Sequence, residues 1–390
     1  MAKVRMGMIG GGEGAFIGAV HRIAAALDGD IELVCGAFAS DPERSARSGA
    51  ALQLPAERVY ADYPGMLSAE AALPEAERMQ FVSIVTPNHL HYPVAEAALR
   101  AGFHVLCDKP ATYDLAQAVA LRKLLRETGL CYGLTHTYAG YPLVKEARAR
   151  IAAGELGAIR KVVVEYPQGW LAEREEDTDN KQAAWRLDPS RAGPSGCMGD
   201  IGVHAAHLAE YVSGLHISEL CADLTTFVDG RELDDDGGML LRFANGARGL
   251  LWASQVCVGE ENALAIRVYG ERGGLEWRQQ EPNTLWLKWN DRPTQMLRTG
   301  AGYLGDAASQ RTRTPMGHPE GYLEAFANLY RDFARQVRVH AGAEPGDAAR
   351  ENCPGIEAAI RGMAFIELAV AASASDTKWH AFEHATDADS

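Results

Sequence analysis

The stretch VRMGMIGGGEGAFI, residues 4–17, decides the fold. A short apolar run passes directly into a glycine-rich turn, and the turn passes into a segment of helical character. Glycines let a backbone turn sharply and approach a pyrophosphate, which binds at the N-terminus of the helix that follows. A tight strand-to-helix turn without a ligand would give the same pattern, but its place in the first strand–helix unit favours dinucleotide binding. The residues expected to contact such a cofactor are Gly10, Gly12, Gly14, Ala15, Phe16 and Ile17.

Outward from this turn, the first 136 residues alternate short apolar runs with amphipathic segments. Asp41-Pro42 begins one helix and Asp114 another, because aspartate is a favoured N-cap and proline a favoured first helical residue. Apolar runs of this kind are buried on both faces, so the sequence predicts an α/β fold with a doubly wound parallel sheet. Strands are expected at residues 4–9, 31–38, 81–85, 103–107 and 130–135, and further helices at 19–27 and 92–101.

Beyond residue 136 the pattern changes to one of strands and tight turns. A helix is predicted at 141–153, and strand-like runs then fill most of residues 159–297. Turn dipeptides such as Asn245-Gly246 separate these runs, as hairpins require. The sequence therefore predicts a large open antiparallel sheet with one face on a core.

Two helices are expected after this sheet, one beginning near His318 and one over residues 355–372. We therefore expect two domains, in line with the length of 390 residues. Residues 1–136 form the cofactor-binding domain, and residues 137–390 form an α/β domain for substrate binding and oligomerisation.

Composition excludes several classes of function. The 38 basic and 52 acidic residues give a net charge of −14, which disfavours binding to nucleic acids and to anionic membranes. No stretch approaches the roughly 18 apolar residues of a membrane span, and the N-terminus lacks the pattern of a signal peptide. The seven cysteines are scattered without zinc-ligand spacing, so we expect a reduced, cytoplasmic protein without a metal.

Two acidic segments are interpreted as exposed. Residues 171–181 are highly charged and are expected to form a surface loop. The triplet Asp234-Asp235-Asp236, with Glu232 before it, lacks the spacing and the terminal glutamate of a Ca²⁺-binding EF-hand. A solvated hairpin turn is the preferred interpretation of this triplet.

Polar residues follow two of the predicted parallel strands, at the sheet edge where ligands of such folds bind. Thr86-Pro87-Asn88-His89-Leu90-His91 follows one strand, and Cys107-Asp108-Lys109-Pro110 follows the next. A lysine at this edge could hydrogen-bond a substrate hydroxyl. The alternatives are a surface lysine for Lys109, and capping or packing around Pro87 for His89 and His91.

In the second half, Asp200 and His204 are four residues apart before an apolar helix. On a helix they would share one face, where the carboxylate could orient a histidine acting as general base. The alternative interpretation is an N-cap aspartate and a packed helix histidine, and spacing alone does not separate the two.

Together these motifs resemble the Gfo/Idh/MocA family of sugar and cyclitol oxidoreductases. The order and rough spacing of Gly10/Gly12, Thr86-Pro87-Asn88, His91, Lys109-Pro110 and Asp200-x-x-x-His204 fit over nearly the whole chain. The resemblance implies a Rossmann domain followed by a domain with a large open sheet. It also implies an NAD(P)-dependent exchange between a secondary alcohol and a ketone, with Lys109, Asp200 and His204 as the catalytic group.

The chain departs from the family pattern in the cofactor-binding part. Its first turn is three residues longer, so that residues 18–21 match the later part of the family motif. Asp108 stands where glutamate is commoner, and Ala39 stands at the usual acidic position. Ser40 and Arg44 could receive a 2′-phosphate, so NAD and NADP both stay open, with a lean toward NAD. The further cofactor-binding residues expected are Ser40, Arg44, Thr86, Pro87, Asn88, His91, Asp108, Lys109 and His136.

Further residues are candidates for binding the substrate. Residues 135–138 resemble the H-N-Y segment of the family, and Trp185-Arg186 resembles its W-R pair. Arg186 could bind substrate hydroxyls or pair with Asp188. The remaining candidates line a pocket in one interpretation and serve packing or capping in the other. The full substrate-binding set is Tyr138, Tyr166, Gln168, Trp185, Arg186, His318 and Tyr322.

The function expected is hydride transfer between NAD(P) and a secondary hydroxyl of a sugar, glycoside or cyclitol. Two alternatives are a glycoside hydrolase that uses bound NAD for transient oxidation, and a nucleotide-binding sensor without turnover. An open sheet with one uncovered face would expose apolar area, so we also expect a homodimer or homotetramer.

Overall fold

The computed structural model describes residues 2–346 and 353–383. The chain forms two compact units that are not continuous in sequence. The first comprises the chain up to Thr135 together with the described residues of Phe326–Ile360, and the second comprises His136–Ala325 and the described residues from Arg361 onward. The sequence pattern predicts a single domain after residue 136, whereas the stretch that begins at Phe326 belongs to the first unit.

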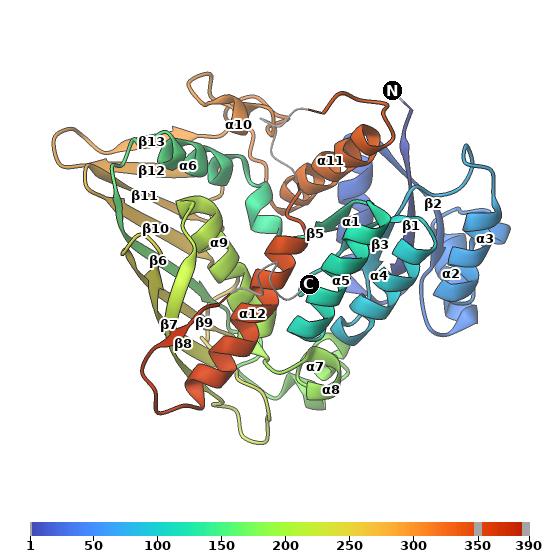
Figure 1. The fold of residues 1–390 in the computed structure, drawn as a ribbon, viewed down its shortest axis with the longest axis horizontal. Coiled ribbons are helices and arrows are strands. Elements are labelled where there is room, and N and C mark those ends of the chain that lie inside the picture. Colours follow the sequence, from blue (N-terminus) through green and yellow to red (C-terminus); the bar gives the residue numbers. More distant parts are fainter. Residues whose placement is uncertain (1, 347–352, 384–390) are drawn as a thin grey trace. The chain divides into compact units, whose positions relative to one another are not determined.

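The first unit contains a five-stranded sheet in which every pair of neighbouring strands is parallel (Figure 1). The strand order is β2-β1-β3-β4-β5, which confirms the predicted doubly wound arrangement. The strands are β1 (Val4–Gly10), β2 (Ile31–Ala37), β3 (Phe81–Val85), β4 (His104–Cys107) and β5 (Tyr132–Leu134).

The helices of this unit begin where the sequence places capping residues. Asp41 accepts a hydrogen bond from the Arg44 amide at 2.9 Å, and Asp114 accepts one from the Gln117 amide at 2.8 Å. Both predicted caps are therefore confirmed, while the first helix begins at Phe16, three residues before its predicted start. The helices are α1 (Phe16–Leu27), α2 (Pro42–Ala51), α3 (Tyr63–Ala72), α4 (His91–Arg100) and α5 (Leu115–Thr128), with short turns η1 (Ala56–Arg58) and η2 (Asn88–Leu90).

Helix α11 (Tyr322–His340) enters the first unit because its apolar stripe packs against the parallel sheet. Phe333 meets Phe81 edge to face at 5.3 Å between ring centroids, and the Tyr330 hydroxyl lies 2.8 Å from the Ser83 hydroxyl. Residues of opposite parity in the strands, such as Val82 and Ile84, belong to the core cluster that includes residues of α3, α4 and α5. Both faces of the sheet are thus buried.

The second unit contains a nine-stranded sheet in the order β13-β12-β11-β10-β6-β9-β8-β7-β14. All its pairs are antiparallel except β6 with β9, which is parallel, so the sheet is mostly antiparallel rather than wholly so. A long segment with helices separates β6 from the β7-β8-β9 meander, and only such a long connection permits a parallel pair. The strands are β6 (Ile159–Pro167), β7 (Ile217–Thr225), β8 (Asp236–Phe243), β9 (Arg248–Ser254), β10 (Ala265–Gly270), β11 (Gly273–Arg278), β12 (Thr284–Trp289), β13 (Gln295–Arg298) and β14 (His380–Ala381).

Helices cover one face of this sheet. α9 packs on β6, β9 and β10, and α6 packs on β11 and β12. The helical elements after β5 are η3 (Thr137–Gly140), α6 (Pro142–Ala152), η4 (Glu175–Asp177), α7 (Lys181–Arg186), α8 (Pro189–Ala192), the π-turn η5 (Met198–Gly202), α9 (Val203–Ser213), α10 (Asp306–Ser309) and α12 (Ile356–Ser373).

The interpretation of the two acidic segments as exposed was wrong in part. Leu171, at the start of the charged block 171–181, is fully buried. Asp234 and Asp235 are also buried, because their carboxylates accept hydrogen bonds from backbone amides rather than from water. The triplet is therefore no solvated turn.

Candidate functional site

The glycine-rich turn between β1 and α1 leaves no room for a side chain at Gly10 or Gly12. Gly10 has a φ of +82°, and a Cβ placed on it would lie 2.8 Å from the Val85 carbonyl oxygen. A Cβ on Gly12 would lie 2.7 Å from the Ser48 hydroxyl and 2.8 Å from the Phe38 carbonyl oxygen. The Gly12 amide donates to that same carbonyl at 3.1 Å, which fixes the turn against the end of β2.

The start of α1 fits the phosphates of a dinucleotide. Its N-cap residue, Ala15, provides no side-chain cap, so no side chain of the cap takes up the amides of the first turn. Phe16, the first helical residue, is 64% exposed, and Ile17 is half-buried. A turn with crowded glycines, followed by a helix without a side-chain cap, is the arrangement that suits pyrophosphate binding.

The end of β2 presents a mixed set of groups. Asp41 is engaged as the α2 cap, Ser40 is exposed, and Ala39 and Arg44 are half-buried. The Arg44 guanidinium is the cation that the first turn of α2 contributes at this end of the sheet. Contact of Ser40 or Arg44 with a 2′-phosphate of the cofactor stays a prediction.

His91 joins the two loops that follow β3 and β4. Its Nε2 lies 2.8 Å from the Thr86 carbonyl oxygen and its Nδ1 lies 2.6 Å from the Pro110 carbonyl oxygen. Burial lowers the pKa of His91, although both carbonyls favour the protonated ring. This histidine thus ties the Thr86-Pro87-Asn88 motif to Lys109-Pro110, whose peptide bond is cis.

Asp108 fixes the backbone of Lys109. Its Oδ1 accepts hydrogen bonds from the Lys109 amide at 2.9 Å and from the Thr135 hydroxyl at 2.8 Å. Its Oδ2 lies 3.8 Å from Nε2 of His21, a fully buried ring whose Nδ1 is 2.8 Å from the Tyr330 hydroxyl. Burial lowers the pKa of His21 to about 4, so this ring is neutral near pH 7.

In the second unit, Asp200 lies in the π-turn η5 and His204 in the first turn of α9. Asp200 Oδ2 accepts a hydrogen bond from Gln255 Nε2 at 2.9 Å, and the Arg186 Nε forms an ion pair with it at 3.4 Å. Asp188 instead caps α8 through the Ser190 amide. Arg186 thus forms an ion pair with the carboxylate of Asp200, which neither interpretation named, and its role in binding substrate hydroxyls stays a prediction.

His204 is buried among aromatic rings. The Tyr138 ring meets it edge-on at 4.9 Å between centroids, His136 at 5.6 Å, and Tyr166 at 6.5 Å. The His136 ring in turn stacks on His207 at 3.9 Å. The structure therefore brings His136, Tyr138 and Tyr166 together around His204.

The hydroxyls of Tyr138 and Tyr166 belong to a closed hydrogen-bonded ring with Asn262. Tyr166 donates to Asn262 Oδ1 at 2.7 Å, and Asn262 Nδ2 donates to the Tyr138 hydroxyl at 3.3 Å. The two tyrosine hydroxyls bond each other directly, which closes the ring. Gln168 Nε2 also donates to Asn262 Oδ1 at 2.7 Å. Burial, followed by the influence of Tyr138, Tyr322 and Asp200, raises the pKa of Tyr166 well above its usual range.

The other substrate candidates differ in their surroundings. The Arg186 guanidinium stacks over the Trp185 ring at 4.4 Å, and it also donates to Gln182 Oε1 at 2.6 Å. Tyr322 begins α11 and acts electrostatically on Tyr166. The exposed His318 side chain turns back toward the Pro315 carbonyl oxygen at 3.3 Å. Its pocket-lining role stays a prediction.

Comparison with known proteins agrees with this organisation. Residues 4–136 match the family model described as "Oxidoreductase family, NAD-binding Rossmann fold", and residues 144–276 match the one described as "GFO/IDH/MocA C-terminal domain". The uncharacterized oxidoreductase YfiI of Bacillus subtilis is 34% identical over 385 residues, which is 97% of each chain. The chain belongs to the Gfo/Idh/MocA family.

Solved structures and one further relative extend this assignment of the Gfo/Idh/MocA chain. An inositol dehydrogenase homolog of Azotobacter vinelandii, in complex with NAD⁺, superposes with a TM-score of 0.93 at 37% identity over 97% of both chains. A second structure of such a homolog from that organism, with NADH and myo-inositol, has a TM-score of 0.90 at 36% identity over 97% of both chains. The levoglucosan dehydrogenase of Pseudarthrobacter phenanthrenivorans is 27% identical over 322 residues, 73% of this chain and 76% of its own.

The comparisons confirm that this Gfo/Idh/MocA member is an NAD(P)-dependent oxidoreductase with a Rossmann domain. Among the described residues there is no cluster of three or more histidine, cysteine or acidic side chains suited to a metal ion. Nor does any described helix combine the length and apolar character needed to cross a membrane.

Sequence reasoning missed two residues of this Gfo/Idh/MocA site. Gln255 and Asn262 both lie in the chain between β9 and β10, and neither belongs to a recognisable motif. The pairing of β9 with β6 helps to place this loop, whose side chains contact Asp200 and the two tyrosines.

Proposed function

We propose that this enzyme oxidises a secondary hydroxyl of a ring polyol with NAD⁺, and that its substrate is a cyclitol or a closely related sugar. The observation that supports this most is the His204 ring, enclosed by Tyr138 and His136 and preceded by the Asp200 carboxylate. The Azotobacter relatives, which were solved with NAD⁺ and with NADH and myo-inositol, favour inositols as the first substrates to test.

The cofactor is assigned to the Rossmann unit. The glycine turn and the first amides of α1 would hold its pyrophosphate, with the Thr86-Pro87-Asn88 and Asp108-Lys109 loops at the nicotinamide end. When bound, the nicotinamide accepts the hydride from the carbon that bears the substrate hydroxyl. NAD⁺ is preferred over NADP⁺ because the related structures carry it. Arg44 and Ser40 nevertheless make NADP⁺ the necessary comparison in any assay.

The protein moves the proton. His204 accepts it from the substrate hydroxyl as general base, and Asp200 orients this residue and the substrate. Lys109 donates a hydrogen bond to the same substrate oxygen, following the family motif. The aromatic rings around His204 limit the access of water to its imidazole. Arg186 and Trp185 are candidates for binding the other hydroxyls of the substrate.

The test is the absorbance of the reduced nicotinamide during incubation with a panel of polyols. The panel contains myo-inositol, glucose and levoglucosan, each with NAD⁺ and with NADP⁺ in separate reactions. We expect turnover with NAD⁺ and myo-inositol or a stereoisomer of it. Release of an aglycone from a glycoside without net NADH would identify the hydrolase instead, and tight cofactor binding without any turnover would identify the sensor.

We further propose that the uncovered face of the nine-stranded sheet forms a subunit interface. The register of the strands places Leu240, Leu250, Trp252 and Tyr269 on this one face, and all four are exposed. Several large apolar side chains exposed on one face of a sheet are typical of an interaction site. Leu250→Glu combined with Trp252→Glu is expected to reduce the mass measured by light scattering. Met316→Glu, at an exposed loop position, is the matched control.

A further inference from the structure

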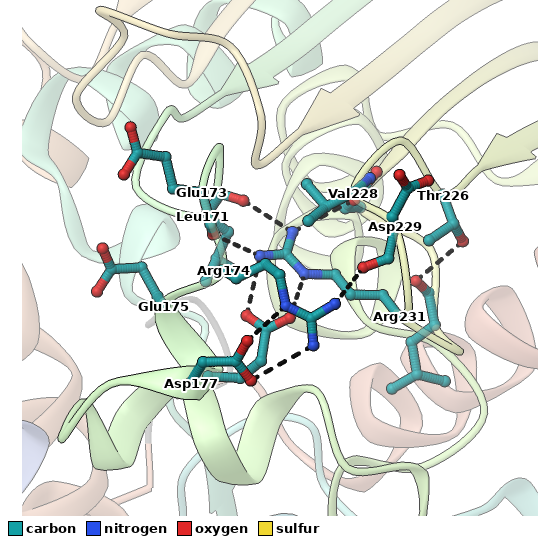
Figure 2. A network of polar contacts seen from close by, with 12 residues as sticks. Leu171, Glu173, Arg174, Glu175, Asp177, Thr226, Val228, Asp229 and Arg231 are labelled. Carbon is teal, nitrogen blue, oxygen red and sulfur yellow. Dashed lines mark hydrogen bonds and ion pairs between the residues drawn. The ribbon is translucent and has the colours of Figure 1, made fainter.

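A network of polar contacts in the second unit takes no part in the mechanism proposed above. Its centre is Arg231, whose side chain is only 1% exposed. The guanidinium donates to the carbonyl oxygens of Leu171 and Glu173, both at 2.7 Å, and to the two carboxylate oxygens of Glu176 at 2.9 and 3.0 Å (Figure 2). A buried guanidinium needs such complete pairing, because removing its charge from water is costly. Arg231 therefore fixes the outer segment 171–177.

The same guanidinium reaches a second buried charge, Asp235. One carboxylate oxygen of Asp235 lies 3.3 Å from Arg231 Nη1, and the carboxylate also accepts hydrogen bonds from the amides of Phe227 and Val228 at 2.8 and 3.0 Å. The backbone of Asp235 continues the network, since its carbonyl oxygen accepts a hydrogen bond from the Gln255 amide at 2.8 Å.

Gln255 connects this network back to segment 171–177. Its carbonyl oxygen accepts a hydrogen bond from the Leu171 amide at 3.0 Å, and Leu171 is itself held by Arg231. With both its backbone groups bound, the buried Gln255 directs its side-chain Nε2 to Asp200 Oδ2 at 2.9 Å. The orientation of the Asp200 carboxylate is thus connected to the anchoring of segment 171–177.

Asp234 binds the backbone at the start of the η5 turn that carries Asp200. Its two carboxylate oxygens accept hydrogen bonds from the amides of Gly196 and Met198, each at 2.9 Å. These amides lie directly before Asp200 in the chain. Asp234 therefore holds the turn that carries Asp200. The next residue, Asp235, holds Gln255, which contacts the Asp200 carboxylate.

We propose that Gln255 is a positioning residue for Asp200, and that the buried Arg231–Asp235 pair holds Gln255 and segment 171–177 in one fixed arrangement. The catalytic consequence rests on the role proposed for Asp200, whereas the structural coupling does not. Segment 171–177 leads into α7, which carries Arg186, the second partner of Asp200. Gln255 is therefore connected to Arg231 through Leu171 and Asp235, and Arg186 lies on the helix that follows the segment held by Arg231.

The first test measures turnover in Gln255→Leu with NAD⁺ and myo-inositol. We expect kcat to fall at least tenfold while KM changes less than threefold. The carboxylate proposed to orient His204 loses its own orientation, whereas the groups that bind the substrate are unchanged. NAD⁺ affinity stays unchanged. Gln279→Leu, the same change at a half-buried glutamine in this unit, retains full activity. Full kcat in Gln255→Leu, in an enzyme that His204→Ala inactivates, would refute the positioning role and leave the proposed function standing.

The second test needs no substrate and measures amide hydrogen exchange. Arg231→Lys is expected to accelerate exchange at least tenfold both in residues 171–177 and around residue 255, and Gln255→Leu is expected to do so in residues 198–202. Arg174→Lys is the matched control, because Arg174 lies in the same network but its side chain is 46% exposed and pairs with Asp177 (Figure 2). Acceleration in Arg231→Lys confined to residues 171–177 would refute the coupling. Unchanged amide exchange in residues 198–202 of Gln255→Leu would also refute the coupling. This outcome is informative even if the enzyme turns over no polyol of the panel.

Discussion

The two units hold their reactive residues by different means. In the first unit, neighbouring backbone groups do most of the work: glycines shape the turn, the carbonyls of Thr86 and Pro110 flank His91, and Asp108 binds the Lys109 amide. In the second unit, Asp200 depends on side chains that are distant in sequence, above all Gln255. Contacts between residues close in sequence can be predicted from a short motif. Contacts between residues far apart in sequence become apparent only once the strands have paired.

The largest effects are expected from the residues proposed to react, one set in each unit. Because general acid–base catalysis contributes about 10²–10⁴-fold, His204→Ala and Lys109→Met should each reduce kcat by orders of magnitude. His216→Ala, at a histidine whose side chain is 67% exposed, serves as control and should retain kcat. Steady-state kinetics with the best polyol of the panel provide the measurement. Near-normal turnover in both variants would remove the catalytic assignment from both units.

A second experiment tests the glycine-rich turn of the first unit by itself. Gly10→Ala should weaken NAD⁺ binding at least tenfold in titration calorimetry, because the new Cβ meets the Val85 carbonyl at 2.8 Å and the residue keeps a positive φ. Gly29→Ala, at a φ of +71° with open space around it, isolates the conformational cost alone. If both variants bind NAD⁺ equally well, the close approach in the turn is of no consequence for the cofactor.

A third experiment tests whether the chain after residue 325 supports the first unit. Phe333→Ala removes a fully buried ring that packs on Phe81, and such truncations cost about 3–5 kcal/mol. We expect that loss in chemical denaturation, together with weaker NAD⁺ binding. Tyr303→Ala, at an exposed aromatic position of the second unit, should leave both unchanged. Equal destabilisation by the two variants would contradict the assignment of α11 to the first unit.

The smallest effect is a loss of stability in acid that arises in the first unit. Burial, followed by the nearby His340, lowers the pKa of His104 to about 4 from 6.5, and its Nδ1 accepts a hydrogen bond from the Cys131 amide at 2.9 Å. The unfolded chain binds this proton below pH 6.5 and the folded chain only near pH 4, so stability present above pH 6.5 falls as the pH drops between these values. From pH 7 to pH 5 the loss is about 2 kcal/mol.

His104→Gln removes this contribution, so its free energy of unfolding should decline about 2 kcal/mol less than that of the wild type between pH 7 and pH 5. Gln279→Leu, which removes no titratable group, should decline as the wild type does. Urea denaturation at the two pH values measures the difference. Parallel declines in all three proteins would show that His104 carries none of the acid sensitivity.

The sequence predicted those features that depend on neighbours along the chain. The β1–α1 turn, the caps at Asp41 and Asp114, and the polar residues after β3 and β4 lie where they were expected. The parallel pairing of β6 with β9 was not predicted, because strand patterns report which residues are buried but not the direction of a partner strand.

Buried charged residues are the second feature that the sequence did not predict. Asp234 and Asp235 look like a solvated turn in sequence, since acidic triplets are ordinarily exposed. Their partners are amides and an arginine from separate loops, and no spacing rule identifies those partners in advance. The same applies to Arg186, whose nearest acidic neighbour in sequence is Asp188 while its ion pair is with Asp200.

The return of α11 to the parallel sheet has a consequence for biosynthesis. Strands β1 to β5 emerge from the ribosome long before α11, and strands β6 to β13 are made in between. Throughout this interval the sheet face with Phe81 and Ser83 lacks the helix that buries it. The Rossmann unit therefore cannot complete its fold as a nascent N-terminal domain, and the growing chain carries an apolar surface that chaperones would recognise until residues 322–340 have been translated.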